Sequence, residues 1–163
     1  MSLENLVSNI EKKPFGLNDI VNKIPKAQGI LYSELGNSLP KFEKTLVILL
    51  DPPNKLGHFV GLIKKSDFEM IFFDPYGKGL DFLTKILDLP PTLKNLLKNY
   101  RLEENHHQFE VLSPKINTCG MWVILRLRLS NLSNQKFRKV MRYKTLPSDS
   151  LAVLLNLMNF NMI

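Results

Sequence analysis

The sequence predicts a single domain that combines helices with β-strands, and three observations support this. The chain has 163 residues, the length of one ordinary domain that can bury its own core. Its composition, 44% hydrophobic and 23% charged, is that of a globular protein rather than a disordered one. Segments with helical and with strand-like apolar spacing follow one another, without an internal repeat or a low-complexity region. We therefore expect one domain over residues 1–163.

Several segments have the apolar spacing of helices. Residues 2–13 carry apolar side chains at helical intervals among polar ones, which predicts an amphipathic helix rather than a signal peptide. A short helical turn is expected at 18–23. Further helices are expected at 80–87, 92–100, 135–143 and 151–158, with Pro90 and Pro91 separating the first pair and with Thr92 and Ser148 as N-caps. No run reaches the length of a membrane span.

The strands are expected in the middle of the chain. Residues 45–50, Thr-Leu-Val-Ile-Leu-Leu, form a continuous apolar run that predicts a strand buried on both faces at the sheet centre. The runs 58–65 and 68–74 predict a β-hairpin, and 109–112 is a candidate for a short further strand.

The loop of this hairpin decides which side chains share a face. A three-residue loop at 65–67 places His58 opposite Asp74, with both side chains on one face of the sheet. A two-residue loop shifts the register by one and separates the two side chains, unless a bulge restores the alignment. A contact between His58 and Asp74 therefore requires the longer loop or the bulge.

The only cysteine of the chain is the strongest candidate for chemistry. Asn117 or Thr118 is a plausible N-cap, which would put Cys119 in the first turn of a helix, although the alternation in 123–129 is equally typical of a half-buried strand. A helix N-terminus favours a thiolate, and Gly120 permits a substrate to approach closely. Free cysteine is nevertheless often just a small buried apolar residue.

Two further residues complete a candidate catalytic set. His58 stands at the start of a strand, from which its side chain can reach a cleft, although a lone histidine is more often a packing or surface residue. Asp74 precedes a proline and is by default a turn residue, but beside His58 its carboxylate would orient the imidazole. His106 and His107 lie in a polar segment and are expected to be solvated.

Three short blocks in this order resemble those of the adenovirus-type cysteine proteases. They are Gly57-His58-Phe59, then Phe72-Phe73-Asp74-Pro75-Tyr76-Gly77, then Thr118-Cys119-Gly120-Met121-Trp122. The spacings, 16 residues from His58 to Asp74 and 45 from Asp74 to Cys119, suit the compact viral members of that clan, which extends to virophages and Polinton-like elements and also includes the SUMO-specific proteases.

The resemblance implies an α+β fold in which a small, mainly antiparallel sheet packs against the nucleophile-bearing helix. It also implies a cysteine endopeptidase with Cys119 as nucleophile, His58 as base and Asp74 as orienting residue. The clan usually carries a glutamine six or seven residues before the cysteine to bind the oxyanion, but those positions hold Ser113 and Leu112. Asn117, or else Ser113, is expected to take this role together with the Cys119 backbone amide.

By the same resemblance, the substrates would be viral capsid or core precursor proteins, cut in the virion or in the reducing interior of the infected cell. A monomer without cofactor or metal is expected. The formal charge of +7 has one marked concentration, since seven basic residues and no acidic one occur from Arg126 to Lys144. Arg138, Lys139 and Arg142 are the candidates for binding DNA there, although a solvated helix face is an equal alternative.

Two other functions share these residues. A protease that removes a ubiquitin-like modifier would use the same three side chains. A basic nucleic-acid-binding or capsid-associated protein would use the positive charge, with Cys119, His58 and Asp74 as structural residues. The reactivity of the Cys119 thiol separates the second alternative from both enzymes.

Overall fold

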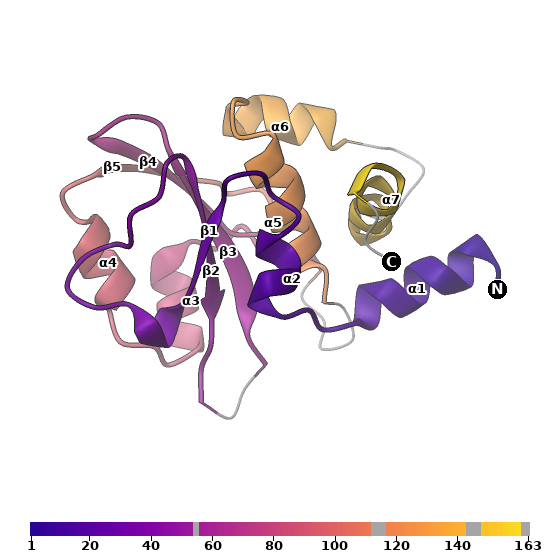
Figure 1. The fold of residues 1–163 in the computed structure, drawn as a ribbon, viewed down its shortest axis with the longest axis horizontal. Coiled ribbons are helices and arrows are strands. Elements are labelled where there is room, and N and C mark those ends of the chain that lie inside the picture. Colours follow the sequence, from indigo (N-terminus) through magenta and orange to yellow (C-terminus); the bar gives the residue numbers. More distant parts are fainter. Residues whose placement is uncertain (54–55, 112–116, 143–147, 161–163) are drawn as a thin grey trace.

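The computed structural model of the chain describes residues 1–53, 56–111, 117–142 and 148–160. Its centre is a five-stranded sheet in the order β1-β2-β3-β4-β5, with helices on both faces (Figure 1). In that order the strands are Gln28–Leu31, Thr45–Leu50, His58–Lys64, Glu69–Phe73 and Arg101–Glu104. The fold therefore has three layers, helix, sheet and helix, and the helix that bears Cys119 packs against the sheet as expected.

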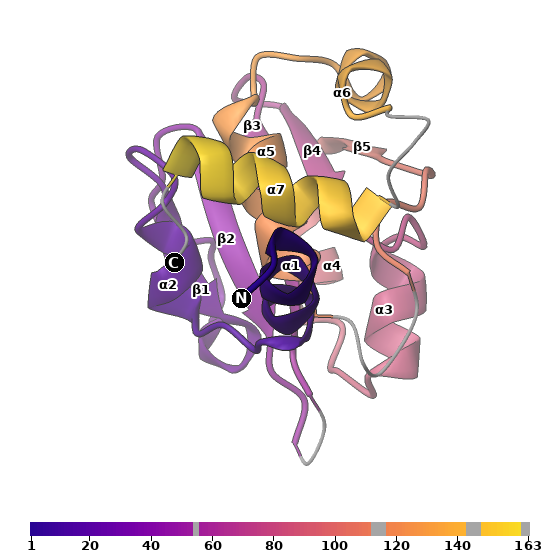
Figure 2. The same cartoon turned by 90° about the vertical axis from the view of Figure 1, so that its right-hand side faces the viewer.

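The helices divide between the two faces of the sheet. One face carries α2 (Leu17–Val21) and α5 (Cys119–Arg128), and over them lie α1 (Leu3–Lys12), α6 (Asn134–Val140) and α7 (Ser148–Phe160). The other face carries the 3-10 helix η1 (Tyr32–Glu34), α3 (Leu80–Ile86) and α4 (Thr92–Leu97). Figure 2 shows α7 running across α5 with α1 beside it. None of the described helices combines the length and the apolar character needed to cross a membrane.

The sheet is mixed, which corrects the expectation of a mainly antiparallel one. Strand β3 pairs antiparallel with β2 and with β4, whereas β1 runs parallel to β2 and β5 runs parallel to β4. The parallel pairs arise because β1 reaches β2, and β4 reaches β5, through long connections that contain helices rather than through tight turns. The centre of the sheet is β3, not the strand at 45–50, although that strand is buried on both faces as expected.

The hairpin of β3 and β4 forms with a register two positions later than expected. Lys64 pairs with Met70 rather than with Phe68, and the loop comprises residues 66–68. The loop thus has the expected odd length, but its position in the sequence differs by one residue. A shift by two positions keeps every side chain on the face it was expected to occupy.

This register determines what lies beside His58. Continued beyond the last pair, it places His58 opposite Tyr76 rather than opposite Asp74. The two rings are stacked, with centroids 4.2 Å apart and planes 5° from parallel. Asp74, two residues before Tyr76, remains on the face of His58, as the hairpin analysis requires.

The alternating side chains of the strands form two cores. Val47, Ile63 and Phe73 belong to the core under α5, whereas their neighbours in the strands, such as Leu62 and Phe72, belong to the core under α3 and α4. Close packing of α5 on β3 depends on Gly61, because a Cβ atom there would lie 2.9 Å from the side chain of Leu127. The start of α5 lies where β3 begins, since a Cβ atom at Gly120 would lie 3.2 Å from the Phe59 ring.

Four local expectations need correction. Residues 101–104 form the edge strand β5, where no strand was expected, and residues 109–111 form no strand, Leu112 lying outside the described residues. The helix at 92–97 begins after Pro91, and Thr92 does not cap it. Ser148 is the first residue of α7 and donates its hydroxyl to the Phe109 carbonyl. The segment after Cys119 is a helix, which resolves the alternative of a strand.

Candidate active site

Asp74 is the most tightly held residue of the site. It directly follows β4, and its side chain is fully buried. The carboxylate accepts hydrogen bonds from three backbone N–H groups, at Tyr76 (2.9 Å), Lys78 (2.9 Å) and Gly79 (3.2 Å). Its backbone is held by Asn105, which accepts from the Asp74 N–H at 2.8 Å and donates to the Asp74 carbonyl at 2.6 Å. These backbone hydrogen bonds therefore fix the position of the carboxylate independently of His58.

His58 receives its orientation from this carboxylate. At the start of β3 and 3% exposed, it places Nε2 2.9 Å from Asp74 Oδ1. Because a carboxylate only accepts, Nε2 is the nitrogen that carries a proton. In the neutral ring, Nδ1 therefore has a free lone pair, and it is buried with no hydrogen-bond partner among the described residues. The stacked ring of Tyr76 limits rotation of the imidazole.

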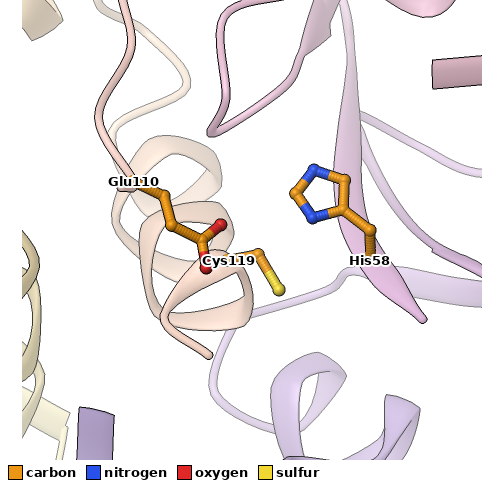
Figure 3. Close-up of side chains that lie close together, drawn as sticks. All are labelled: His58, Glu110 and Cys119. Carbon is orange, nitrogen blue, oxygen red and sulfur yellow. The ribbon is translucent and has the colours of Figure 1, made fainter. Parts of the chain in front are cut away.

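Cys119 is the first residue of α5 and faces this histidine. Its sulfur lies within 4.8 Å of a His58 ring nitrogen and of a carboxylate oxygen of Glu110. In Figure 3, His58 from β3 and Glu110 from the segment before α5 both point toward Cys119. A thiol beside an unpartnered imidazole nitrogen is the arrangement of a nucleophile and its base. In a protein without substrate, such a pair often lies farther apart than an ideal hydrogen bond.

The electrostatics keep the resting thiol neutral. Burial raises the pKa of Cys119 well above its ordinary value, and the Glu110 carboxylate raises it further. The backbone N–H groups of Phe59, Gly120 and Cys119 itself lower that pKa. The helix N-terminus thus favours the thiolate, as expected, but burial has the larger effect. A thiolate at Cys119 would therefore require a nearby proton acceptor, and the His58 ring is a basic group close to the sulfur.

Glu110 is a member of this site that sequence reasoning missed. Its side chain is 1% exposed, and Oε1 accepts a hydrogen bond from the Thr118 backbone at 3.0 Å. Oε2 is buried and has no partner among the described residues. The local sequence offered one signal, an acidic residue between Phe109 and Val111, but buried acids are rare and the segment has no regular structure to indicate which way its side chains point.

Asp149 connects the site to α7. Its carboxylate accepts from the Thr118 hydroxyl, from Trp122 Nε1 at 3.3 Å and from the Val111 N–H at 3.0 Å. It therefore ties the start of α5 and the segment that carries Glu110 to one helix. Its charge, close to Glu110, is one reason that the pKa of Glu110 is high.

Cys119 reaches the surface through a narrow opening. It lines a cavity of about 190 Å³ together with the apolar side chains of Phe15, Leu49, Leu56 and Phe59. A larger hollow of about 1030 Å³ lies at the opposite end of β3, beside Lys64, and contains none of the site residues. The small cavity is therefore the route by which a substrate would reach the sulfur.

The remaining residues of the expected site have other surroundings. The side-chain amide of Asn117 donates to the Lys12 carbonyl at 2.9 Å, which directs it toward α1, although Asn117 also lines the small cavity. Ser113 lies outside the described residues. Gly120 serves packing, because a Cβ atom there would lie 2.5 Å from Ile20 Cδ1. The close approach at Gly120 is made by α2, and Gly120 also lines the small cavity beside Cys119.

The described basic residues from Arg126 to Arg142 are not all exposed. Arg138, Lys139 and Arg142 are exposed on and after α6. Arg126 is fully buried, and it donates to the carbonyls of Leu129 and Leu132, so it closes the end of α5. Burial lowers its pKa to about 10.

The spacing within the site is also compatible with a metal ion. Within the described parts of the chain, His58, Glu110 and Cys119 are the one group of three such side chains with donor atoms this close together. The nucleophile-and-base arrangement accounts for the same geometry without a metal.

Comparison with known proteins gives one relative of clear sequence similarity. The uncharacterized protein V9 of Sputnik virophage is 31% identical over 119 residues, which cover 63% of this chain and 68% of that protein. No protein-family model matches the sequence. V9 is a viral protein, and its own function is not established by its name.

Two solved structures have a distant similarity in fold. The crystal structure of ASFV pS273R protease aligns with a TM-score of 0.36 and 14% identity, over 71% of this chain and 43% of that chain. The central domain of the uncharacterized Lpg1148 protein from Legionella pneumophila aligns with a TM-score of 0.40 and 16% identity, over 90% of each chain. Both similarities are too distant to assign an activity.

Proposed function

The chain belongs to the same family as the uncharacterized protein V9 of Sputnik virophage, and we propose that it is a cysteine endopeptidase. Cys119 is the nucleophile, His58 is the general base and Asp74 orients the histidine. One observation carries the proposal: the buried His58–Asp74 pair leaves His58 Nδ1 without a partner beside the only cysteine sulfur of the chain. A buried nitrogen without a partner is costly, and it is typical of a site whose partner arrives with the reaction.

The reaction proceeds by covalent catalysis. His58 Nδ1 takes the thiol proton, and the sulfur attacks the carbonyl carbon of a peptide bond. The carbon–nitrogen bond then breaks, and the leaving amine takes the proton from His58. Water, deprotonated by the same nitrogen, hydrolyses the thioester and frees Cys119. Asp74 keeps Nε2 protonated and stabilises the imidazolium that forms in each half of the cycle.

The cavity at Cys119 favours an apolar side chain beside the cut bond. It is about 190 Å³, and its walls include Leu49 and Phe59 from the two strands next to it. An apolar cavity of about 150 Å³ holds a benzene molecule, so this cavity has room for a side chain and does not select glycine. The proposed substrates are viral capsid or core precursor proteins, in keeping with a viral relative.

A proteome-derived peptide library tests the proposal even while the natural substrate is unidentified. The native protein should cleave a defined set of peptides with apolar residues beside the cut, and Cys119→Ala should cleave none. The same library distinguishes the alternative enzyme, because a protease for a ubiquitin-like modifier would require the folded modifier and would leave the short peptides intact. Absence of cleavage by the native protein, in the library and in a folded Gly-Gly-tailed modifier, would contradict both.

A further inference from the structure

Glu110 is the buried ionisable group that the proposed reaction does not use. We propose that Glu110 acts in its neutral form and donates its carboxyl O–H to the oxyanion that forms when Cys119 attacks a carbonyl. It would supply the side-chain half of the oxyanion hole, and the backbone N–H of Cys119 would supply the other half. The inference rests on the proposed endopeptidase activity and adds a catalytic residue to it.

The hydrogen bonds of the carboxyl group determine which oxygen can donate. Oε1 accepts from the Thr118 N–H at 3.0 Å, so it uses the lone pair that the carbonyl-type oxygen of an acid provides. The proton of a neutral Glu110 therefore lies on Oε2. This oxygen is buried and has no partner among the described residues, so no protein acceptor there occupies its O–H.

The position of the carboxyl group suits an oxyanion. A carboxyl oxygen lies within 4.8 Å of the Cys119 sulfur, and the oxyanion is bonded to the carbon that this sulfur attacks. The Cys119 backbone N–H interacts with the Glu110 carboxylate and also with the Cys119 sulfur, lowering the pKa of both. The Glu110 carboxyl group and the Cys119 backbone N–H thus lie next to each other, close to the sulfur.

The surroundings keep Glu110 protonated at neutral pH. Burial raises its pKa to about 8, and the charges of Asp149 from α7 and Asp74 after β4 contribute to this rise. The N–H groups of Thr118 and Cys119 at the start of α5 act in the opposite direction, with a smaller effect. The other ionisable groups close to Glu110 are the His58 imidazole on β3, the Cys119 thiol on α5 and the Tyr76 hydroxyl after β4.

The neutral form is also the form that the reaction requires. A carboxylate at this position would oppose the Cys119 thiolate, whose pKa it raises, and would repel an oxyanion. A carboxylic acid removes both repulsions and adds a donor. In acylation the sulfur–carbon bond forms, the carbonyl π electrons move to oxygen, and Glu110 shares its proton with that oxygen without releasing it. On collapse the electrons return, the carbon–nitrogen bond breaks, and the amine takes the proton from His58.

Two substitutions test this role with a fluorogenic peptide made from the best site in the library. Glu110→Ala removes the donor, and kcat should fall by about 10²–10³-fold. Glu110→Gln has the same shape and keeps an N–H donor, so kcat at pH 7 should return to within about tenfold of the native value. The native rate should decline as pH rises through about 8, where Glu110 loses its proton, and this decline should be absent in Glu110→Gln.

A reaction without an oxyanion provides the control. Alkylation of Cys119 by iodoacetamide at pH 7 forms no tetrahedral intermediate, so Glu110→Ala should not slow it. An unchanged kcat in Glu110→Ala, or an alkaline decline that persists in Glu110→Gln, would overturn the assignment of Glu110 and leave the endopeptidase intact. If the native protein cleaves no peptide, the proposed function fails and the role of Glu110 fails with it.

Discussion

The Nε2 atom of His58 lies 2.9 Å from Oδ1 of Asp74, and both side chains are buried. The Asp74 carboxylate accepts from this nitrogen and from three backbone N–H groups, so each of its oxygens faces donors only. A neutral carboxamide cannot replace it without turning an NH₂ group toward another donor. The pair therefore requires a carboxylate, and it determines which nitrogen of His58 is free.

Asp74→Asn is consequently expected to lower both activity and stability. We expect kcat to fall by about 10²–10⁴-fold, because the imidazole loses its preferred tautomer. The free energy of unfolding should fall by about 1–3 kcal/mol, because a buried donor is left unpaired. Asp67→Asn, in the exposed hairpin loop, is the matched control and should change neither quantity. An Asp74→Asn enzyme of native kcat would show that the carboxylate does not orient the base.

The raised pKa of Glu110 makes stability depend on pH. In the unfolded chain this carboxyl loses its proton near pH 4.5, whereas in the folded protein it keeps the proton up to about pH 8. Between these values the unfolded state binds fewer protons, so the free energy of unfolding falls as pH rises, by an amount on the order of a few kcal/mol. Glu110→Gln should remove this contribution.

Urea unfolding of the native protein and of Glu110→Gln, at intervals between pH 4.5 and 8.5, measures this contribution as the difference between the two proteins. The substituted protein should gain stability relative to the native one as pH rises. A constant difference over the whole range would mean that Glu110 is ionised in the folded protein at neutral pH.

The packing at Gly120 predicts a steric effect on the nucleophile. A Cβ atom at Gly120 would lie 2.5 Å from the Cδ1 atom of Ile20, which is fully buried and has little room to move. Gly120→Ala should lower the unfolding free energy by about 1–3 kcal/mol and displace the start of α5. At the exposed Gly36 a Cβ atom meets nothing within 4 Å, so Gly36→Ala should be neutral in a thermal melt. Equal melting temperatures for the two variants would contradict this packing.

The exposed basic residues of α6 and the segment after it give a prediction about DNA. If Arg138, Lys139 and Arg142 contact phosphates, replacing all three with Gln should weaken DNA binding and reduce its dependence on salt. Fluorescence anisotropy with duplex DNA at several salt concentrations measures both effects.

Charge alone could produce part of that result, so the control removes the same charge elsewhere. Lys41, Lys85 and Lys98 are exposed outside this segment, and their replacement with Gln changes the net charge by the same amount. It should weaken binding much less. Unchanged DNA affinity in the α6 triple variant would remove the proposed role.

The sequence predicted the relation between His58 and Asp74 better than it predicted their register. The face on which each side chain lies depends only on whether the hairpin loop has an odd or an even number of residues. The predicted faces are therefore correct even though the strand register differs by two positions. The register itself was wrong, because polar turn residues do not define where the last strand pair forms. Stacking of Tyr76 on His58 follows from the true register and was not expected.

Other parts of the fold depend on contacts that a single sequence does not contain. Strand β5 is a short edge strand, Arg-Leu-Glu-Glu, whose alternation is too brief to distinguish it from a polar loop. Its parallel pairing with β4, like that of β1 with β2, makes the sheet mixed, which the resemblance to a mainly antiparallel fold did not indicate. Burial of Glu110 arises because Asp149 from α7 and Thr118 before α5 meet at the loop that carries it.

The most direct test of the central claim is the rate at which iodoacetamide alkylates Cys119 at pH 7 in the native protein, in His58→Ala and in His106→Ala. His58 is the proposed base, whereas His106 is exposed and outside the site. If the thiol gives its proton to His58, the rate should fall at least about tenfold in His58→Ala and should not change in His106→Ala. Equal rates in all three proteins, rising only near the pKa of about 8.5 of a free thiol, would show an independent cysteine and contradict the proposed endopeptidase.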